Sequence, residues 1–116
     1  GVCMDEKTLT ELKDRLLYLK REIQQRIKDN NDRVRSLESG DEGDFSNSIS
    51  YKDLTYNLIE KDRAQLIEIE EALYRMENNT YGICERCKEP IEIERLKAKP
   101  TAKYCAKCKH IIESHR

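Results

Sequence analysis

The sequence predicts a mostly α-helical protein: a long antiparallel helical hairpin of the coiled-coil type, then a small four-cysteine domain and a short C-terminal helix. Three observations predict this fold. Apolar residues recur at helical spacing from residue 5 onward, a turn-forming segment interrupts them, and two Cys-x2-Cys pairs follow. We expect the hairpin over residues 5–78, with its turn at 38–50, and the cysteine domain with its C-terminal helix over 79–116.

The composition favours an extended helical structure over a thick globular core. Charged residues make up 39% of the 116 residues and hydrophobic residues 37%, with no Trp and one Phe. A hairpin needs only a narrow apolar seam, for which this composition is sufficient. The net charge of -1 by itself indicates neither a nucleic-acid nor a membrane partner. The sequence contains neither a signal-peptide pattern nor an apolar run of about 18 residues, so we expect a cytoplasmic protein.

The first predicted helix covers residues 5–37, and its apolar residues follow a pattern close to a heptad repeat. Asn30 falls where the repeat requires a seam residue. Such a pattern is typical of a coiled coil. Acid-before-base pairs four residues apart, such as Glu22 and Arg26, indicate that the other faces are solvated. The predicted apolar seam consists of Leu9, Leu12, Leu16, Leu19, Ile23, Ile27, Val34 and Leu37.

Two glycines and several Asp, Asn and Ser residues predict a turn over residues 38–50. The second helix is expected to run from about Ser50 to Asn78, with Ser50 and Asp53 as a weak capping box. A loop between two long helices favours an antiparallel hairpin, which we expect to be monomeric. The less regular seam of this helix is predicted to contain Leu54, Leu58, Ile59, Leu66, Ile69, Leu73 and Met76.

Four cysteines in the pattern C-x2-C-x17-C-x2-C are the candidate metal ligands: Cys84, Cys87, Cys105 and Cys108. Two cysteines separated by two residues can present both sulfurs to one tetrahedral ion, and two such pairs complete its shell. The spacing lies in the range of zinc ribbons, so we expect one structural Zn²⁺ in a zinc-finger domain. The alternatives are free thiols or a redox Cys-x2-Cys pair, although the sequence lacks a thioredoxin-like context.

Other reactive residues do not form a catalytic pattern. His110 and His115 lie near the end of the chain, in a helix expected from about Ala106, and zinc does not need them as ligands. Cys3 is expected to have no role. No Ser/His/Asp arrangement is evident, and four thiolates leave no open metal position. We therefore expect that the protein is not an enzyme.

Charge is distributed unevenly along the chain. Residues 95–109 contain six Lys or Arg and no acid, which fits an anion-binding surface for nucleic acid, a nucleotide or an acidic protein face, or a solvated surface. Residues 36–51 contain four acids and no Lys or Arg. These acids fit either contacts with a metal or a basic partner site, or an ordinary polar loop. Composition alone leaves both pairs of interpretations open.

The segment from Tyr81 to Lys109 resembles the zinc finger of the DksA/TraR family, which are bacterial regulators of RNA polymerase. The resemblance rests on the four cysteines and on their spacers, YGICERC, PI, IERL, AKPTA and C-x2-CK. The preceding hairpin agrees with the family in length and position.

The resemblance implies direct binding to bacterial RNA polymerase, without sequence-specific DNA binding. The hairpin would enter the secondary channel and modulate promoter open-complex stability and initiation. The tip motif of the family, Asp-x-x-Asp-x-Ala, falls on Asp41, Asp44 and Ser46, so that Ser replaces Ala. Two alternatives stay open: a nucleic-acid-binding zinc ribbon that uses residues 95–109, and an adaptor that docks another protein on its hairpin.

The resemblance also implies a possible co-regulator of the stringent response, guanosine tetraphosphate. Lys61, Lys99 and Lys109 align with basic residues of its family site. Glu68 and Gln65, however, align with a Lys and a Leu. Because Glu68 would place a negative charge near a highly anionic ligand, we expect weak or no coupling to this alarmone.

Overall fold

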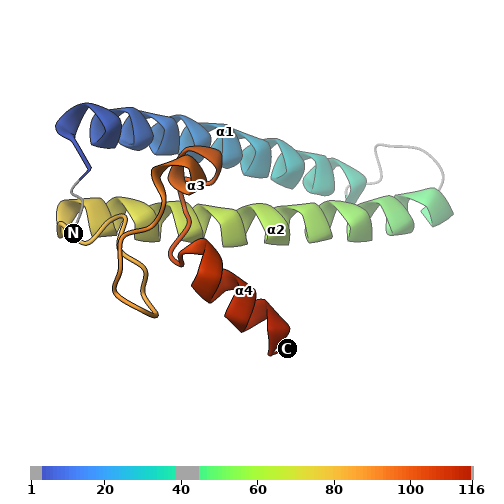
Figure 1. The fold of residues 1–116 in the computed structure, drawn as a ribbon. Coiled ribbons are helices and arrows are strands. Elements are labelled where there is room, and N and C mark those ends of the chain that lie inside the picture. The colour runs from blue at the N-terminus through green and yellow to red at the C-terminus, as the bar shows by residue number, and fades with distance from the viewer. Residues whose placement is uncertain (1–3, 39–44, 116) are drawn as a thin grey trace. The chain divides into compact units, whose positions relative to one another are not determined.

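The computed structural model describes residues 4–38 and 45–115, and side chains outside 45–50. Within these residues it contains four helices and no β-strand, which confirms the mostly helical prediction (Figure 1). None of these helices offers an apolar stretch long enough to cross a bilayer. The helices are α1 (Glu6–Glu38), α2 (Phe45–Glu77), α3 (Ile93–Ala98) and α4 (Ala106–Ser114).

Asp5 lies just before α1 and sets its start, one residue after the predicted start of the helix. The Thr8 backbone N–H donates a hydrogen bond of 2.7 Å to Oδ1 of Asp5, and the Leu9 N–H donates one of 3.0 Å to its carbonyl oxygen. Asp5 thereby acts as the N-cap, satisfying a donor that the helix leaves free. Hydrogen bonds from the side chain and backbone of Thr8 hold the pKa of Asp5 below its usual value.

The start of α2 differs from the prediction. The helix begins at Phe45, so Ser50 lies inside it and not at an N-cap. Ser and Asn favour turns, on which the prediction rests, but the same residues are also favoured where a helix begins. Ser46 of the predicted tip motif therefore lies in the first turn of α2, whereas Asp41 and Asp44 lie outside the described residues.

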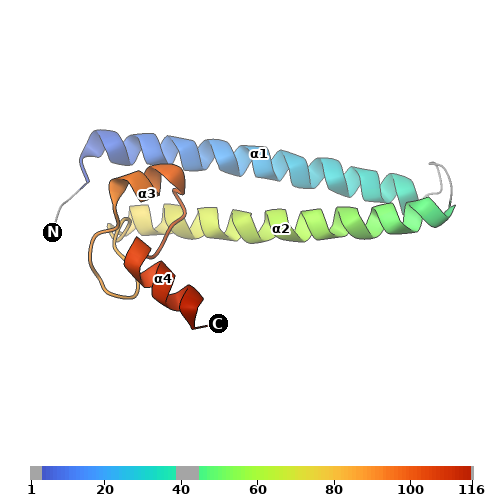
Figure 2. The same ribbon diagram turned by 45° about the vertical axis from the view of Figure 1, so that its right-hand side comes forward.

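The chain divides into two compact units, and α1 and α2 contribute to both. The first, which we call the finger unit, comprises Gly1–Leu19 and Glu68–Arg116. The second, the arm unit, comprises Lys20–Ile67. Within each unit the segments of α1 and α2 run antiparallel, as both ribbon views show (Figures 1 and 2). This pairing is the predicted helical hairpin.

The finger unit has an apolar core that joins the helices to the zinc-finger segment. Leu96 of α3 is completely buried, and burial of such a side chain stabilises a fold by about 2 kcal/mol. Arg15 of α1 donates a hydrogen bond to the carbonyl oxygen of Lys97 at the end of α3. α3 was not predicted, because six residues are too few to show helical periodicity. Buried core residues are Leu12, Leu16, Ile69, Ala72, Met76, Tyr81, Ile91, Leu96 and Ala102.

The arm unit has a partly polar seam. The buried residues here are Ile23, Asn30, Val34, Thr55, Ile59 and Asp62. Asn30 thus occupies the seam position that the heptad pattern assigned to it. Leu54 and Leu58, in contrast, are 58% and 47% exposed, so their predicted place in the seam was wrong. Thr55, Ile59 and Asp62 lie in the seam because they share one heptad phase. That phase continues along α2 in alternating steps of four and three residues, through Leu66 to Met76.

Candidate metal centre and its surroundings

The four predicted metal ligands come together in the finger unit. The sulfur atoms of Cys84, Cys87, Cys105 and Cys108 all lie within 4.8 Å of one another. Those of Cys87 and Cys105 are 3.8 Å apart, which is about the edge of a tetrahedron of sulfurs placed about 2.3 Å from a central Zn²⁺. Three of the four cysteines are buried and Cys87 is exposed. The donor set and its spacing fit one structural zinc ion, as predicted.

The first Cys-x2-Cys pair lies in a tight turn that follows α2. The chain leaves the helix through Asn79, whose φ is 59°, and Gly82, whose φ is 84°. A side chain at Gly82 would be strained by this φ and would meet Met4 Cε at 3.1 Å. The Cys84 N–H then donates to the Glu89 carbonyl at 2.8 Å, which closes the turn around Cys87.

The second pair is formed where α4 begins. Cys105 is the N-cap of α4, and its sulfur accepts the Cys108 N–H at 3.4 Å. The Ala106 N–H donates to a carboxylate oxygen of Glu92 at 3.3 Å, so a side chain from just before α3 satisfies another free donor of α4. The Glu85 N–H donates to the Lys103 carbonyl at 2.9 Å and ties the two cysteine turns together.

Without a metal, the thiols of Cys84 and Cys87 differ in pKa. Burial opposes ionisation of Cys84, but N–H groups that include those of Cys87 and Arg86 outweigh burial and lower the pKa to about 6. The Glu89 N–H favours the Cys87 thiolate, but desolvation and the three neighbouring thiols raise the pKa of Cys87 to about 12. A divalent cation is what allows all four sulfurs to be thiolates together.

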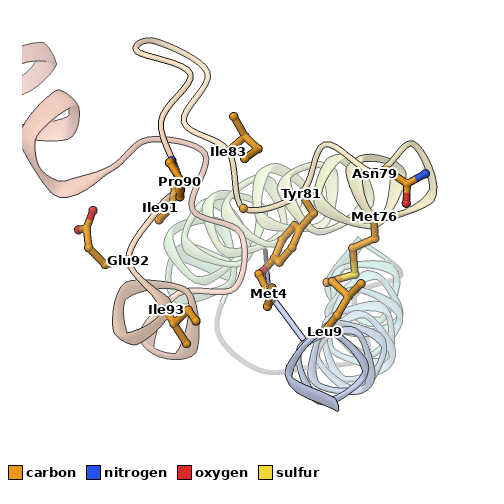
Figure 3. A pocket seen from close by; sticks show the side chains of 11 residues that line it. Met4, Leu9, Met76, Asn79, Tyr81, Ile83, Pro90, Ile91, Glu92 and Ile93 are labelled. Carbon is orange, nitrogen blue, oxygen red and sulfur yellow. The ribbon is translucent and has the colours of Figure 1, made fainter. Parts of the chain in front are cut away.

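The finger unit also contains an apolar pocket that the sequence did not indicate. Its volume is about 620 Å³, which lies within the range of small-molecule sites, about 300–1,000 Å³. Figure 3 shows Met4, Leu9, Met76 and Tyr81 on one side and Pro90, Ile91 and Ile93 on the other. The Tyr81 hydroxyl donates a 2.7 Å hydrogen bond to the Pro100 carbonyl. Because its lining resembles core positions in sequence, such a pocket is visible only in the fold.

A second, charged hollow brings together residues that the sequence analysis treated separately. Lys99 and Lys109, two of the three predicted anion contacts, line a space of about 80 Å³ together with Glu68 and Glu71. The third predicted contact, Lys61, is an exposed residue of the arm unit, as is Gln65. Further residues of the hollow are Arg95, Thr101, Ala102, Lys103 and Tyr104.

Part of the basic run 95–109 is engaged within the finger itself. The Arg95 side chain donates a 2.9 Å hydrogen bond to the Tyr104 carbonyl. The Lys103 ammonium lies 5.8 Å from the centre of the Tyr104 ring. With Glu68 and Glu71 lining the same hollow, the run does not form a uniformly positive surface.

Comparison with known proteins identifies relatives along nearly the whole chain. Residues 79–114 match the family described as prokaryotic dksA/traR C4-type zinc finger. The chain is 36% identical to an uncharacterized protein of Aquifex aeolicus over 115 residues, which cover 95% of this chain and 79% of that protein. It is 32% identical over 104 residues to the RNA polymerase-binding transcription factor DksA of Caulobacter vibrioides, covering 85% of this chain and 71% of that protein.

A solved structure supports the same relationship. Transcription factor DksA2 from Pseudomonas aeruginosa superimposes with a TM-score of 0.87 at 33% identity, over 96% of this chain and 87% of that one. The relatives with DksA names are described as transcription factors, which agrees with the prediction of a non-enzymatic protein. The finger, the paired helices and the relatives agree: the chain belongs to the DksA/TraR family of zinc-finger transcription factors.

Proposed function

We propose that this protein is a cytoplasmic, DksA-like regulator that binds bacterial RNA polymerase directly. Its arm unit enters the secondary channel, where the turn between α1 and α2 alters the stability of promoter open complexes and thus initiation. The observation that carries the proposal is the extent of the likeness. It covers the arm as well as the finger, since 96% of the chain superimposes on DksA2.

The arm unit provides features that such an insertion requires. Its two helices pair through a narrow seam, and the exposed faces hold mixed charges, among them Glu22, Asp29 and Arg33. The six residues between Glu38, which ends α1, and Phe45, which begins α2, include both Asp41 and Asp44. The two acids of the tip motif therefore belong to the connection that would be presented to the polymerase active site.

The nucleic-acid alternative gains no support from the finger unit. Glu68 and Glu71 line the same hollow as Lys99, Lys103 and Lys109, so the cations have acidic neighbours. A zinc ribbon that binds nucleic acid through phosphate contacts would need these cations free, and its affinity would fall steeply with salt. We expect weak binding to naked DNA, with little preference for sequence.

The test measures binding of fluorescently labelled protein to core RNA polymerase, with a transcript-cleavage factor as competitor for the secondary channel. Asp41→Asn with Asp44→Asn is compared with a matched control, Asp53→Asn with Glu60→Gln, which removes the same charge from exposed positions of α2. We expect the cleavage factor to reduce polymerase binding of all three proteins. Only the Asp41/Asp44 variant should lose the effect on open complexes.

Other outcomes would count against the proposal. Binding that the cleavage factor does not reduce would exclude the secondary channel. If the Asp41/Asp44 variant destabilises open complexes as strongly as the unmodified protein does, the tip is excluded as the effector. Absence of polymerase binding, together with salt-dependent binding to DNA, would favour the zinc-ribbon alternative.

We further propose that guanosine tetraphosphate couples weakly to this protein. Glu68 lies beside Lys99 and Lys109 and would repel an anionic ligand there. Glu68→Lys should therefore increase the alarmone response of the polymerase complex, whereas Glu70→Lys, an exposed change on the same helix, should not. An unmodified protein that already responds as strongly as its Glu68→Lys variant would contradict this proposal.

A further inference from the structure

Arg86 connects the two cysteine pairs through a side-chain hydrogen bond. It is one of the two residues between Cys84 and Cys87, and its Nη1 donates to the Cys108 sulfur at 3.7 Å, across 22 positions of the chain. This N···S distance is longer than an N–H···O bond because sulfur is the larger acceptor. The contact therefore places a permanent positive charge next to the sulfur of a metal ligand.

The other three sulfurs receive backbone donors. Cys84 accepts from N–H groups of its own turn and of Cys105, Cys87 accepts from the Glu89 N–H, and Cys105 accepts from the Cys108 N–H. Cys108 is different because it is the third residue of α4, Ala106–Ser114. The N–H groups that follow it point along the helix toward carbonyl oxygens of the preceding turn, so they are not available to its sulfur.

A cysteine thiolate that accepts no N–H hydrogen bond would be the least firmly held of the four metal ligands. Four thiolates around a divalent cation leave a net charge of about -2, which hydrogen bonds from N–H groups disperse. A hydrogen bond from a guanidinium to an ionised acceptor is roughly twice as strong as one between neutral groups. Arg86 thus gives Cys108 the outer-shell partner that the helix geometry denies it.

We propose that Arg86 is a positioning residue of the metal centre, which holds the Cys108 thiolate in place and slows metal loss from the second cysteine pair. This role concerns the durability of the zinc site and is independent of the partner of the arm unit. It also assigns the two intervening residues of the first turn to different tasks. Oε1 of Glu85 lies 3.9 Å from Nη1 of Arg75 in α2, whereas the Arg86 side chain contacts the sulfur of Cys108 in the second cysteine pair.

The test compares Arg86→Gln with Lys107→Gln in the full zinc-loaded chain. Both changes remove one positive charge near Cys108, but Lys107 is an exposed residue on the first turn of α4. The rate of zinc transfer to an excess of a chromogenic chelator is measured for each protein. We expect a rate about tenfold higher for Arg86→Gln, the lower end of the range for lost outer-shell partners, and an unchanged rate for Lys107→Gln.

A second measurement separates this role from misfolding. In the Co²⁺-substituted proteins, d–d bands of undiminished intensity would show that the tetrahedral thiolate site still forms. The sulfur-to-cobalt charge-transfer band should then move to lower energy in Arg86→Gln alone, because one thiolate has lost a donor. Equal zinc-transfer rates in the two variants, or a charge-transfer band that does not move in Arg86→Gln, would overturn the proposal.

Discussion

The finger unit and the arm unit pair the same two helices by different means. In the finger unit the buried residues are apolar side chains and cysteines. In the arm unit the buried set includes Asn30, Thr55 and Asp62, which are the polar residues buried within the described part of the chain. The helix pair therefore obtains stability from an apolar core and a metal in the finger unit, and specificity from polar seam residues in the arm unit.

Two of the buried polar residues of the arm unit, Asp62 and Thr55, have hydrogen-bond partners within the unit. Arg26 reaches both carboxylate oxygens of Asp62, with Nε and Nη2 each 2.9 Å from an oxygen. The pair raises the pKa of Arg26, and it crosses from α1 to α2. The Thr55 hydroxyl donates to the Tyr51 carbonyl at 2.8 Å. Buried polar groups of this kind fix the register of paired helices, usually at some expense in stability.

The largest expected effect is loss of the metal from the finger unit. Chelation of zinc, or Cys84→Ser, removes the bonds that join the two cysteine turns, and structural zinc contributes about 10 kcal/mol or more of apparent binding energy in small zinc domains. Hydrogen exchange should show protection lost in residues 79–115 and largely retained in the arm unit. Equal loss of protection in both units would remove the distinction between them, and no loss in either would contradict a structural metal.

The second effect concerns Asp62 in the arm unit. Asp62→Ala leaves Arg26 without its partner and should lower the free energy of unfolding by about 2 kcal/mol, a value reduced because the Arg26 side chain is half exposed. Asp62→Leu should be as stable as the unmodified protein or more so, because it completes the apolar heptad. Urea unfolding measures the stability of both variants, with Asp53→Ala, at an exposed position of α2, as the control. A destabilised Asp62→Leu would show that the ion pair itself stabilises the arm.

The smallest effect is at Tyr81 in the finger unit. Burial raises the pKa of Tyr81 to about 12, so the folded state favours the neutral phenol. This contribution is complete below the ordinary pKa of about 10 and is lost as the pH rises toward 12. Tyr81→Phe removes the hydrogen bond to Pro100 and should cost about 1 kcal/mol at pH 8.

The pH dependence separates this effect from general alkaline damage. Other groups titrate in both proteins, so the stability difference between Tyr81→Phe and the unmodified protein isolates the phenol. That difference should shrink by about 1 kcal/mol between pH 8 and pH 11. Chemical unfolding at the two pH values provides the check. A constant difference would mean that the folded state does not disfavour the Tyr81 phenolate.

Helix periodicity and cysteine spacing were enough to predict the hairpin and the metal ligands, because both signals are local and repeat along the chain. The seam near Thr55 and Asp62 was misassigned because apolar residues received more weight than the heptad phase. The neighbouring Leu54 and Leu58 were apolar but out of phase. α3 contains too few residues to show a period, and its Leu96 is recognised as core only once the finger is folded.

The residues around the metal site could not be predicted as a group, because they are distant in sequence and come together only in the fold. Lys99, Lys109 and Glu68 are separate in the sequence, and only the fold shows that they line one hollow. The bond from Arg86 to Cys108 spans two turns that the sequence separates, so no local pattern indicates it. The tip acids at 41 and 44 stay a prediction, because they lie outside the described residues.

The proposed insertion of the arm unit into the secondary channel of the polymerase is tested most directly by site-specific photo-crosslinking. A photoreactive amino acid is placed at Leu54 of the arm unit or at Ile83 of the finger unit, which are 58% and 37% exposed. With RNA polymerase, we predict an adduct from position 54 to a catalytic subunit, and a transcript-cleavage factor should abolish it. An adduct from position 83 to DNA, with none from position 54 to polymerase, would contradict the proposed function.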